Sequence, residues 1–216
     1  MAAAHPVGAS QPAVRVIVFS KDRSFQLHET LRSLRDNVVA PSCTPSSPSE
    51  APPVSVDVRV LFKVSSPAFR DSYSAIAAQF AGDSRYEFVE EHDFAAQIVE
   101  LVAGTSRGDT SDQFRFVLFT VDDALFCRPF QLGEAASLLL EDPGVFCYHV
   151  KMHPAVTYSH PADKVVDPPP FRDYNVDRAA VASHRAARGG SLTFERSLGT
   201  GDWNYPWDLA GCVRSQ

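Results

Sequence analysis

Short apolar runs of strand length alternate along this chain with segments of helical periodicity. The first run, Val14 to Ser20 (VRVIVFS), is almost entirely β-branched and aromatic, which is typical of a strand buried on both faces of a parallel sheet. Similar runs cover 56–64, 86–91, 114–121 and 145–150. Because the run at 114–121 (FRFVLFTV) is the most hydrophobic, we expect it at the centre of the sheet.

The segments between these runs predict helices. After a polar turn, residues 24–38 place leucines and other apolar residues at near-helical spacing, with Ser24 available as N-cap. Further helices are predicted at 67–82, at 94–102 with Asp93 as cap, and near 130–140. This βαβαβ alternation predicts one α/β domain with a mostly parallel central sheet flanked by helices and joined by right-handed crossovers.

The boundaries of the domain follow from local composition. Residues 1–12 are expected to form a disordered N-terminus, and residues 13–216 the domain. The stretch 40–53 is rich in proline and serine and predicts a flexible insertion. Beyond Lys151 the periodicity fades, so 151–201 are expected to form long loops.

Charge and cysteine content exclude several classes of protein. A net charge of -6 argues against a surface that neutralises nucleic-acid phosphates. The four cysteines form no C-x-x-C pair, so reduced and mostly buried thiols are expected. No apolar run approaches the roughly 18 residues of a membrane span and the N-terminus does not resemble a secretory signal. A soluble, cytoplasmic protein is therefore favoured.

Polar residues follow two of the predicted strands at their carboxyl ends. Ser20, Lys21, Asp22 and Arg23 follow the first strand, and the pair 122–123 (Asp-Asp) follows the strand at 114–121. In an open α/β sheet these ends line one crevice, where ligands bind.

Two adjacent carboxylates at the end of a buried strand repel each other, and a divalent cation is the usual partner that offsets this cost. Mg²⁺ or Mn²⁺ suits a site of one or two carboxylates that meets a diphosphate. Alternatively, Asp122 and Asp123 only begin a turn, one as a cap and one in solvent. Lys21 and Arg23 could likewise be a solvated helix start, with Asp22 paired to one of them.

Four segments resemble family 2-like glycosyltransferases with the GT-A fold, a Rossmann-like architecture. FTVDDALFCRPF is similar to their strand-DD-x-x-F-x-x-P-F segment, and VIVFSKDRSFQLHETLRSL to their first strand and helix. LFKVSSPAFRDSY resembles their second strand and helix, and DWNYPWDLAG their C-terminal acceptor-side loop. The segments occur in the expected order and span nearly the whole chain.

The resemblance implies a metal-dependent enzyme, with Mn²⁺ or Mg²⁺, that moves a sugar from a nucleotide-diphospho-sugar donor to a glycan or other hydroxyl acceptor with inversion. Asp123, with Asp122 beside it, would take the place of the motif that binds metal and diphosphate, while residues 20–23 would line the nucleotide. The usual motif is Asp-x-Asp, but Val121 stands two positions before Asp123. One carboxylate plus a water could then hold the metal.

The acceptor-side loop, residues 202–208, contains both tryptophans of the chain between acidic residues. Aromatic rings beside carboxylates suit the apolar faces and hydroxyl edges of a sugar, although the tryptophans could instead anchor the loop to the core. Inverting transfer needs a carboxylate base. Asp202 and Asp208 are the candidates, and Asp202, which follows Gly199 and Gly201, is favoured.

Four further interpretations can be compared with this one. One of His149, His153 and His160 could add a metal ligand, although ordinary surface or core histidines are the simpler reading. The chain ends eight residues after Asp208, where proteins of this resemblance often continue, so a non-catalytic nucleotide- or glycan-binding relative is the alternative function. A nucleotidyltransferase is disfavoured because SKDRSF has no glycine, and a purely structural role would leave the Asp-Asp pair without purpose.

Overall fold

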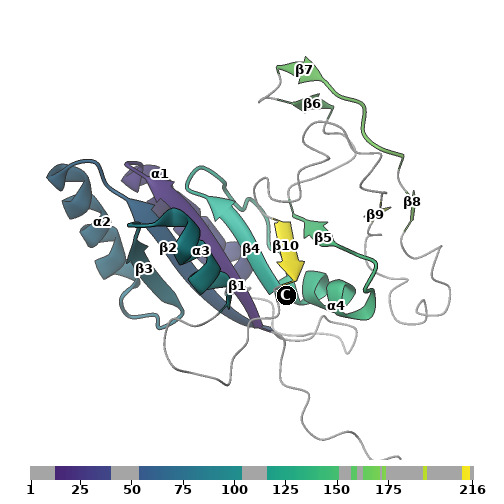
Figure 1. Ribbon diagram of the computed structural model, residues 1–216, viewed down its shortest axis with the longest axis horizontal. Helices are drawn as coiled ribbons and strands as arrows, with labels where there is room; N and C mark the ends of the chain where they lie inside the picture. Colours follow the sequence, from purple (N-terminus) through teal and green to yellow (C-terminus); the bar gives the residue numbers. More distant parts are fainter. Residues whose placement is uncertain are drawn as a thin grey trace, which may run out of the picture.

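The computed structural model describes residues 13–39, 54–103, 116–150, 157–159, 163–170, 172–173, 192–193 and 211–214. Within them, six strands form the main sheet in the order β3-β2-β1-β4-β10-β5 (Figure 1). These strands are β1 (Ala13–Lys21), β2 (Ser55–Lys63), β3 (Tyr86–Glu90), β4 (Phe116–Val121), β5 (Cys147–His149) and β10 (Gly211–Arg214). The predicted N-terminal region 1–12 and insertion 40–53 lie outside the described residues.

Four strands of the sheet are parallel. β1 pairs in parallel with β2 on one side and with β4 on the other, and β2 pairs in parallel with β3. The predicted mostly parallel α/β sheet is therefore confirmed, and β4 has the interior position expected from its hydrophobicity.

Strand β10 was not predicted. It pairs antiparallel with both β4 and β5 and so lies between them. Because β10 is only four residues long (GCVR), it carries too little alternation to be recognised from its own sequence. Its position is instead determined by the edge of β4 that it pairs with.

The helices α1 (Ser24–Leu34), α2 (Pro67–Phe80), α3 (Phe94–Ala103) and α4 (Leu132–Glu141) agree with the predicted segments. A π-helical turn, Arg35–Val39, extends α1. Ser24 is not the N-cap, because Arg23 occupies that position and α1 has no side-chain cap. The Arg23 carbonyl accepts the first helical hydrogen bond from Leu27 N, at 2.9 Å.

The predicted cap of α3 is confirmed. Asp93 Oδ1 accepts a hydrogen bond from Ala96 N at 3.1 Å, and Gln97 Oε1 accepts from Asp93 N at 3.0 Å in return. This reciprocal arrangement satisfies N–H groups that the first turn of a helix leaves without intrahelical partners.

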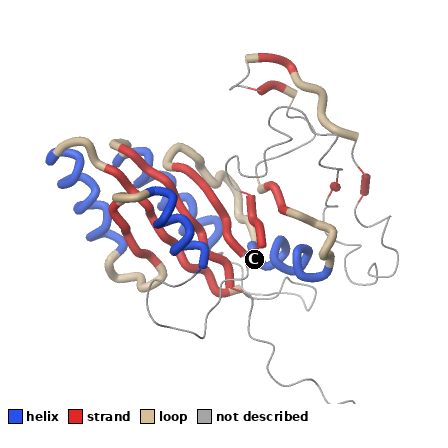
Figure 2. Tube along the Cα trace, in the orientation of Figure 1, coloured by secondary structure: helices blue, strands red, loops and turns tan. Residues whose placement is uncertain are grey.

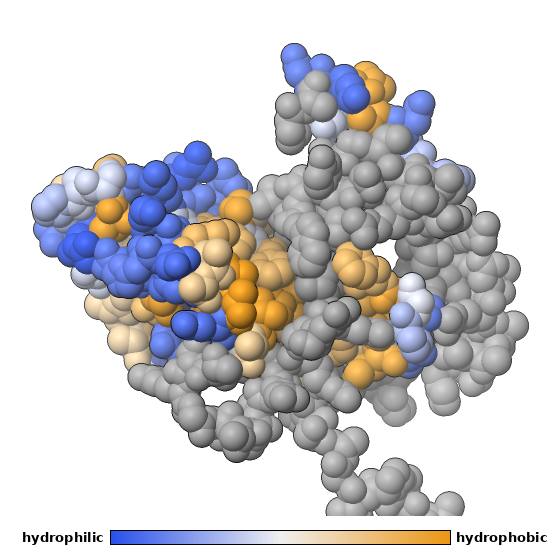
Figure 3. Space-filling model, viewed as in Figure 1, coloured by the Kyte–Doolittle hydropathy of each residue, from blue (hydrophilic) through white to orange (hydrophobic). Residues whose placement is uncertain are grey.

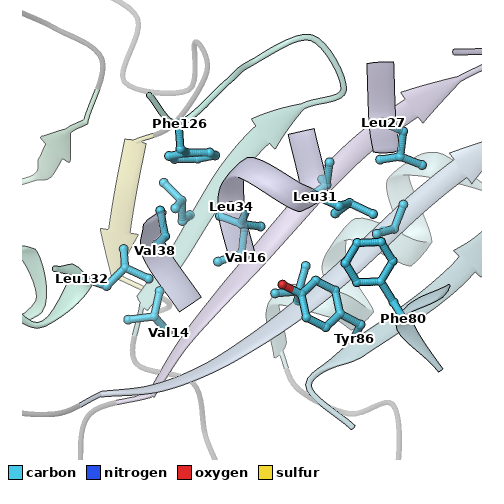
Figure 4. Packing of buried hydrophobic residues seen from close by; sticks show 14 of the residues in the cluster. Val14, Val16, Leu27, Leu31, Leu34, Val38, Phe80, Tyr86, Phe126 and Leu132 are labelled. Atoms are coloured by element: carbon cyan, nitrogen blue, oxygen red, sulfur yellow. The ribbon is translucent and has the colours of Figure 1, made fainter. Parts of the chain in front are cut away.

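Alternate residues of the central strands face opposite sides of the sheet. Val14, Val16 and Val18 of β1 pack with residues of α1, α2 and α4 in one cluster, part of which Figure 4 shows. Ile17 belongs to a second cluster on the other face, where residues of α3 cover it. The helices thus lie on both sides of the sheet, as Figure 2 shows, which explains why β1 reads as a continuous apolar run.

Part of the surface seen in Figure 3 is apolar, along α3 and around β5 and α4. Exposed large apolar side chains of these segments are Phe94 and Val99 of α3, Leu140 of α4, and Phe146, which precedes β5. None of the helices in the described part of the chain combines the length and apolar character that crossing a membrane requires.

The expectation of buried thiols needs correction. Cys127 is exposed, since it lies in the loop between β4 and α4, while Cys147 is half-buried.

Two short antiparallel ladders lie within 151–201, where long loops are expected. They join β6 (Tyr158–Ser159) to β7 (Lys164–Val165) and β8 (Arg172–Asp173) to β9 (Leu192–Thr193). Strands of two residues are too short to show periodicity.

Candidate functional site

The order of the strands reverses at the carboxyl ends of β1 and β4. The chain runs outward from β1 through β2 to β3 and then returns to β4 on the other side of β1. Such a reversal is where ligands bind in open α/β sheets. Phe19 is the register partner of Val121, and Asp122 N continues the ladder with a 3.0 Å bond to the Phe19 carbonyl. Ser20 and Asp122 therefore lie side by side.

The Asp122 side chain is almost completely buried, at 4% exposure. Ser20 Oγ donates to Asp122 Oδ2 at 2.8 Å, and Thr30 Oγ1 on α1 donates to the Asp122 carbonyl at 2.6 Å. Ser20 Oγ also lies 2.5 Å from the Tyr73 hydroxyl, which comes from α2. Hydrogen bonds of this kind are what makes a buried carboxylate tolerable.

Asp123 is half-exposed, and the Arg23 guanidinium contacts both this residue and Asp122. Arg23 Nη1 donates to Asp123 Oδ2 at 3.0 Å and lies 3.6 Å from Asp122 Oδ1. Asp122 and Asp123 also lie in a turn, in which Ala124 N donates to the Val121 carbonyl at 3.3 Å. The structure thus brings the residues that follow β1 and β4 together, and whether the pair binds a metal stays a prediction.

The other two residues of the β1–α1 turn are directed elsewhere. Asp22 has a left-handed backbone (φ 56°), which aspartate tolerates better than most residues. Its Oδ1 accepts from Ser65 N at 2.8 Å, so it fastens the β2–α2 loop instead of pairing with a neighbouring cation. Lys21 is exposed beside its register partner Lys63, and strand alternation puts it on the face of the sheet opposite Ser20.

The loop after Asp123 is fastened to α1. Ser33 Oγ accepts from Phe126 N at 3.1 Å, and Asn37 Nδ2 donates to the Phe126 carbonyl at 2.6 Å. Asn37 also accepts, through its own carbonyl, a 2.8 Å bond from Phe130 N. Thr30 and Ser33 of α1 and Asn37 of the π-helical turn follow one another at helical spacing. Their bonds hold the segment from Asp122 to Phe130.

Sequence reasoning missed Tyr73 and Thr30. Tyr73 is 1% exposed and belongs, with Ile76 and Phe80, to the apolar stripe of α2, so its pattern indicates a core residue. Thr30 gave a weak signal, since it interrupts the leucines of α1 at a buried position. A buried hydroxyl there needs an acceptor, and the backbone of Asp122 supplies one.

The remaining candidates are only partly covered by the structure. Asp202 and Asp208 lie outside the described residues, as do His153 and His160, so their assigned roles stay predictions. His149 lies within β5, where its Nε2 is 3.4 Å from Cys147 Sγ. Where the chain is described, no three His, Cys, Asp or Glu side chains gather closely enough to enclose a metal.

The two aspartates nevertheless fit a divalent cation. Asp122 Oδ1 and Asp123 Oδ2 converge on one guanidinium nitrogen, which shows that a single positive charge can serve both carboxylates. Mg²⁺ and Mn²⁺ accept one or two carboxylate oxygens and complete their shells with water and phosphate oxygens. The exposed Asp123 carboxylate and Oδ1 of the buried Asp122 are therefore a suitable donor set.

The chain is similar in sequence to a known glycosyltransferase. No protein-family model matches the sequence. The chain is 28% identical over 202 residues to the Bifunctional glycosyltransferase pgtA of Dictyostelium discoideum, a match that covers 93% of this chain and 23% of that protein. The chain therefore spans less than a quarter of the length of this relative.

One solved structure with partial similarity is a mannosyltransferase, PcManGT from Pyrobaculum calidifontis, in complex with GDP-Man and Mn²⁺. The similarity has a TM-score of 0.45 and 20% sequence identity, and it covers 68% of this chain and 38% of that one. A likeness of this extent supports no inference about this chain.

Proposed function

We propose that this chain is a metal-dependent glycosyltransferase domain of the family 2-like, GT-A type, which moves a sugar from a nucleotide-diphospho-sugar to a hydroxyl acceptor. The observation that carries the proposal is the shared cation of Asp122 and Asp123 at the reversal point of the sheet. The 28% identity to a bifunctional glycosyltransferase along nearly the whole chain supports it.

Sugar transfer breaks the bond between the anomeric carbon and a diphosphate oxygen, so negative charge develops on the leaving diphosphate. Asp123, and Asp122 through Oδ1, would hold a divalent metal, which supplies charge neutralisation when bound. Asp122 Oδ2 is committed to Ser20, so this carboxylate keeps one orientation. Such preorganisation costs nothing at the moment of reaction.

Arg23 has a second role in this proposal. Its guanidinium is half-exposed and contacts the two carboxylates that would hold the metal, so it would become available for another anion if they did. Guanidinium groups bind phosphate oxygens in a planar, bidentate manner. Arg23 would then contact the diphosphate while Ser20 holds Asp122 in place.

The acceptor side of the reaction is proposed from the loop at 202–208. Trp203 and Trp207 would contact the flat face of an acceptor sugar. Asp202 would remove the proton from the acceptor hydroxyl as the diphosphate leaves, which gives inversion at the anomeric carbon. Asp208 is the second choice for this base.

The test is release of UDP or GDP from their sugar conjugates in the presence of Mn²⁺ and a hydroxyl acceptor, compared among wild type, Asp202→Asn and Asp208→Asn. The proposal expects turnover by wild type and a loss of about a hundredfold or more in Asp202→Asn, as removal of a general base gives. Near-normal turnover in Asp202→Asn with loss in Asp208→Asn would move the base to Asp208. Binding of a nucleotide without release from any donor would favour a non-catalytic relative.

A further inference from the structure

A continuous chain of hydrogen bonds connects the β1–α1 turn to Asp122 through the interior. Arg23 N donates to the Tyr73 hydroxyl at 3.1 Å, this hydroxyl lies 2.5 Å from Ser20 Oγ, and Ser20 Oγ lies 2.8 Å from Asp122 Oδ2. The four groups come from β1, the following turn, α2 and the end of β4. Tyr73 is the member that the proposed chemistry does not use.

The direction of each bond follows from the donors available. An ionised carboxylate can only accept, so the single Ser20 proton points to Asp122. Ser20 Oγ must then accept from Tyr73, and the Tyr73 oxygen accepts from the Arg23 amide. Each group donates towards Asp122, and aligned chains of this kind strengthen one another.

The surroundings of Tyr73 hold its hydroxyl in this place. The ring is buried and stacks on Phe62 with centroids 4.9 Å apart. Burial raises the pKa of the Tyr73 phenol, while its bonds to Ser20 and the Arg23 amide oppose the shift. The phenol therefore stays protonated at neutral pH and remains a donor to Ser20.

We propose that Tyr73 is a positioning residue, which aims Asp122 and the Arg23 turn at a bound metal and nucleotide diphosphate without touching either. It holds Asp122 through Ser20 and the turn through the Arg23 amide. One hydroxyl therefore fixes the positions of both the β1–α1 turn and the end of β4. This inference rests on the proposed function for the identity of the ligand that is positioned.

Tyr73→Phe tests the proposal, because it removes the hydroxyl and keeps the stacked ring. The matched control is Tyr86→Phe, since Tyr86 is also a buried tyrosine and its hydroxyl has no hydrogen-bond partner among the described residues. Affinity for UDP or GDP with Mn²⁺ should fall about three- to tenfold in Tyr73→Phe, because the variant loses the hydroxyl that bonds to both Ser20 and the Arg23 amide. The control should stay close to wild type.

A double-mutant cycle with Ser20→Ala separates positioning from general structural support. If Tyr73 acts partly through Ser20, adding Tyr73→Phe to Ser20→Ala should weaken nucleotide binding less than Tyr73→Phe does in the wild-type background, and the remaining loss would report the bond to the Arg23 amide. Equal affinities in Tyr73→Phe and Tyr86→Phe, or fully additive losses in the double variant, would overturn the proposal. Should Tyr73→Phe fail to fold, Ser20→Ala alone interrupts the chain of hydrogen bonds between Tyr73 and Asp122. Unchanged nucleotide affinity in Ser20→Ala would then also overturn the proposal.

Crystal structures of wild type, Tyr73→Phe and Tyr86→Phe keep this inference distinct from the proposed function. We expect the bond between Ser20 and Asp122 to be lost or lengthened, and the β1–α1 turn to shift, in Tyr73→Phe alone. An unmoved Asp122 and turn in that variant would refute positioning by Tyr73. If wild type binds neither nucleotide, the proposed function fails while this structural comparison still decides the role of Tyr73.

Discussion

Arg23 Nη1 lies 3.0 Å from Asp123 Oδ2, although the two residues are 100 positions apart in the chain. Both side chains are 54% exposed. The same nitrogen is 3.6 Å from the buried Asp122. The guanidinium thus supplies the positive charge that two adjacent carboxylates require.

Arg23→Gln should strengthen the binding of Mn²⁺ alone. A half-exposed ion pair contributes roughly 0.5–1 kcal/mol, so removing the competing guanidinium should raise Mn²⁺ affinity about two- to fivefold. The control is Arg35→Gln. Arg35 forms an ion pair of similar kind outside the site, with Nε 3.1 Å from Asp36 Oδ1. Titration calorimetry without nucleotide measures both. Equal or weaker Mn²⁺ binding by Arg23→Gln would show that the guanidinium and the metal do not compete.

Two buried threonines should respond in opposite directions to replacement by valine. Thr30 Oγ1 donates to the Asp122 carbonyl, whereas Thr120 Oγ1 has no hydrogen-bond partner among the described residues. Thr30→Val should lower the free energy of unfolding by about 1–2 kcal/mol, and Thr120→Val should raise it by up to about 1 kcal/mol. Urea denaturation measures both values. The same loss of stability in both variants would contradict the assigned hydrogen bonds.

Tyr86 should make stability depend on pH in the alkaline range. Burial raises the pKa of Tyr86 to about 12, so the folded state holds the phenolic proton more tightly than the unfolded state. The contribution of this proton to the free energy of unfolding is complete below the ordinary tyrosine pKa of 10.0. It is lost as pH rises towards about 12.

The comparison with Tyr86→Phe isolates this effect from other groups that titrate at high pH. The difference in unfolding free energy between wild type and Tyr86→Phe should be constant near neutral pH. By about pH 11, wild type should have lost roughly 1.4 kcal/mol of stability relative to Tyr86→Phe. Urea denaturation across this range measures it. A difference that does not vary with pH would mean that the phenol is not buried in the folded protein.

Much of the fold could be predicted because its elements are specified locally. The central strands are buried on both faces, so β1 and β4 read as continuous apolar runs, and the helices between them carry apolar stripes. β10 could not be predicted, because its four residues are defined by pairing with β4 and β5. Tertiary contacts of that kind leave no periodic signal in a segment so short.

The site could be predicted only in part, for a similar reason. The rule that ligands bind at the carboxyl ends of strands predicted that Ser20 and Arg23 lie near the two aspartates. The same reasoning grouped Lys21 with them, although the alternation of β1 places the Lys21 side chain on the face of the sheet opposite Ser20. Tyr73 was missed because its ring belongs to the core of α2, and only the folded chain shows where its hydroxyl lies.

A metal-dependent nucleotide site at Asp123 is the basis of the proposed function, and titration of UDP and GDP with and without Mn²⁺ is its decisive test. Asp123→Ala should be compared with Asp36→Ala, because Asp36 is 53% exposed and pairs with an arginine as Asp123 does. We predict that at least one nucleotide binds wild type and Asp36→Ala only with Mn²⁺, and that Asp123→Ala loses this binding. Binding that needs no metal, or that persists in Asp123→Ala, would contradict the proposed site.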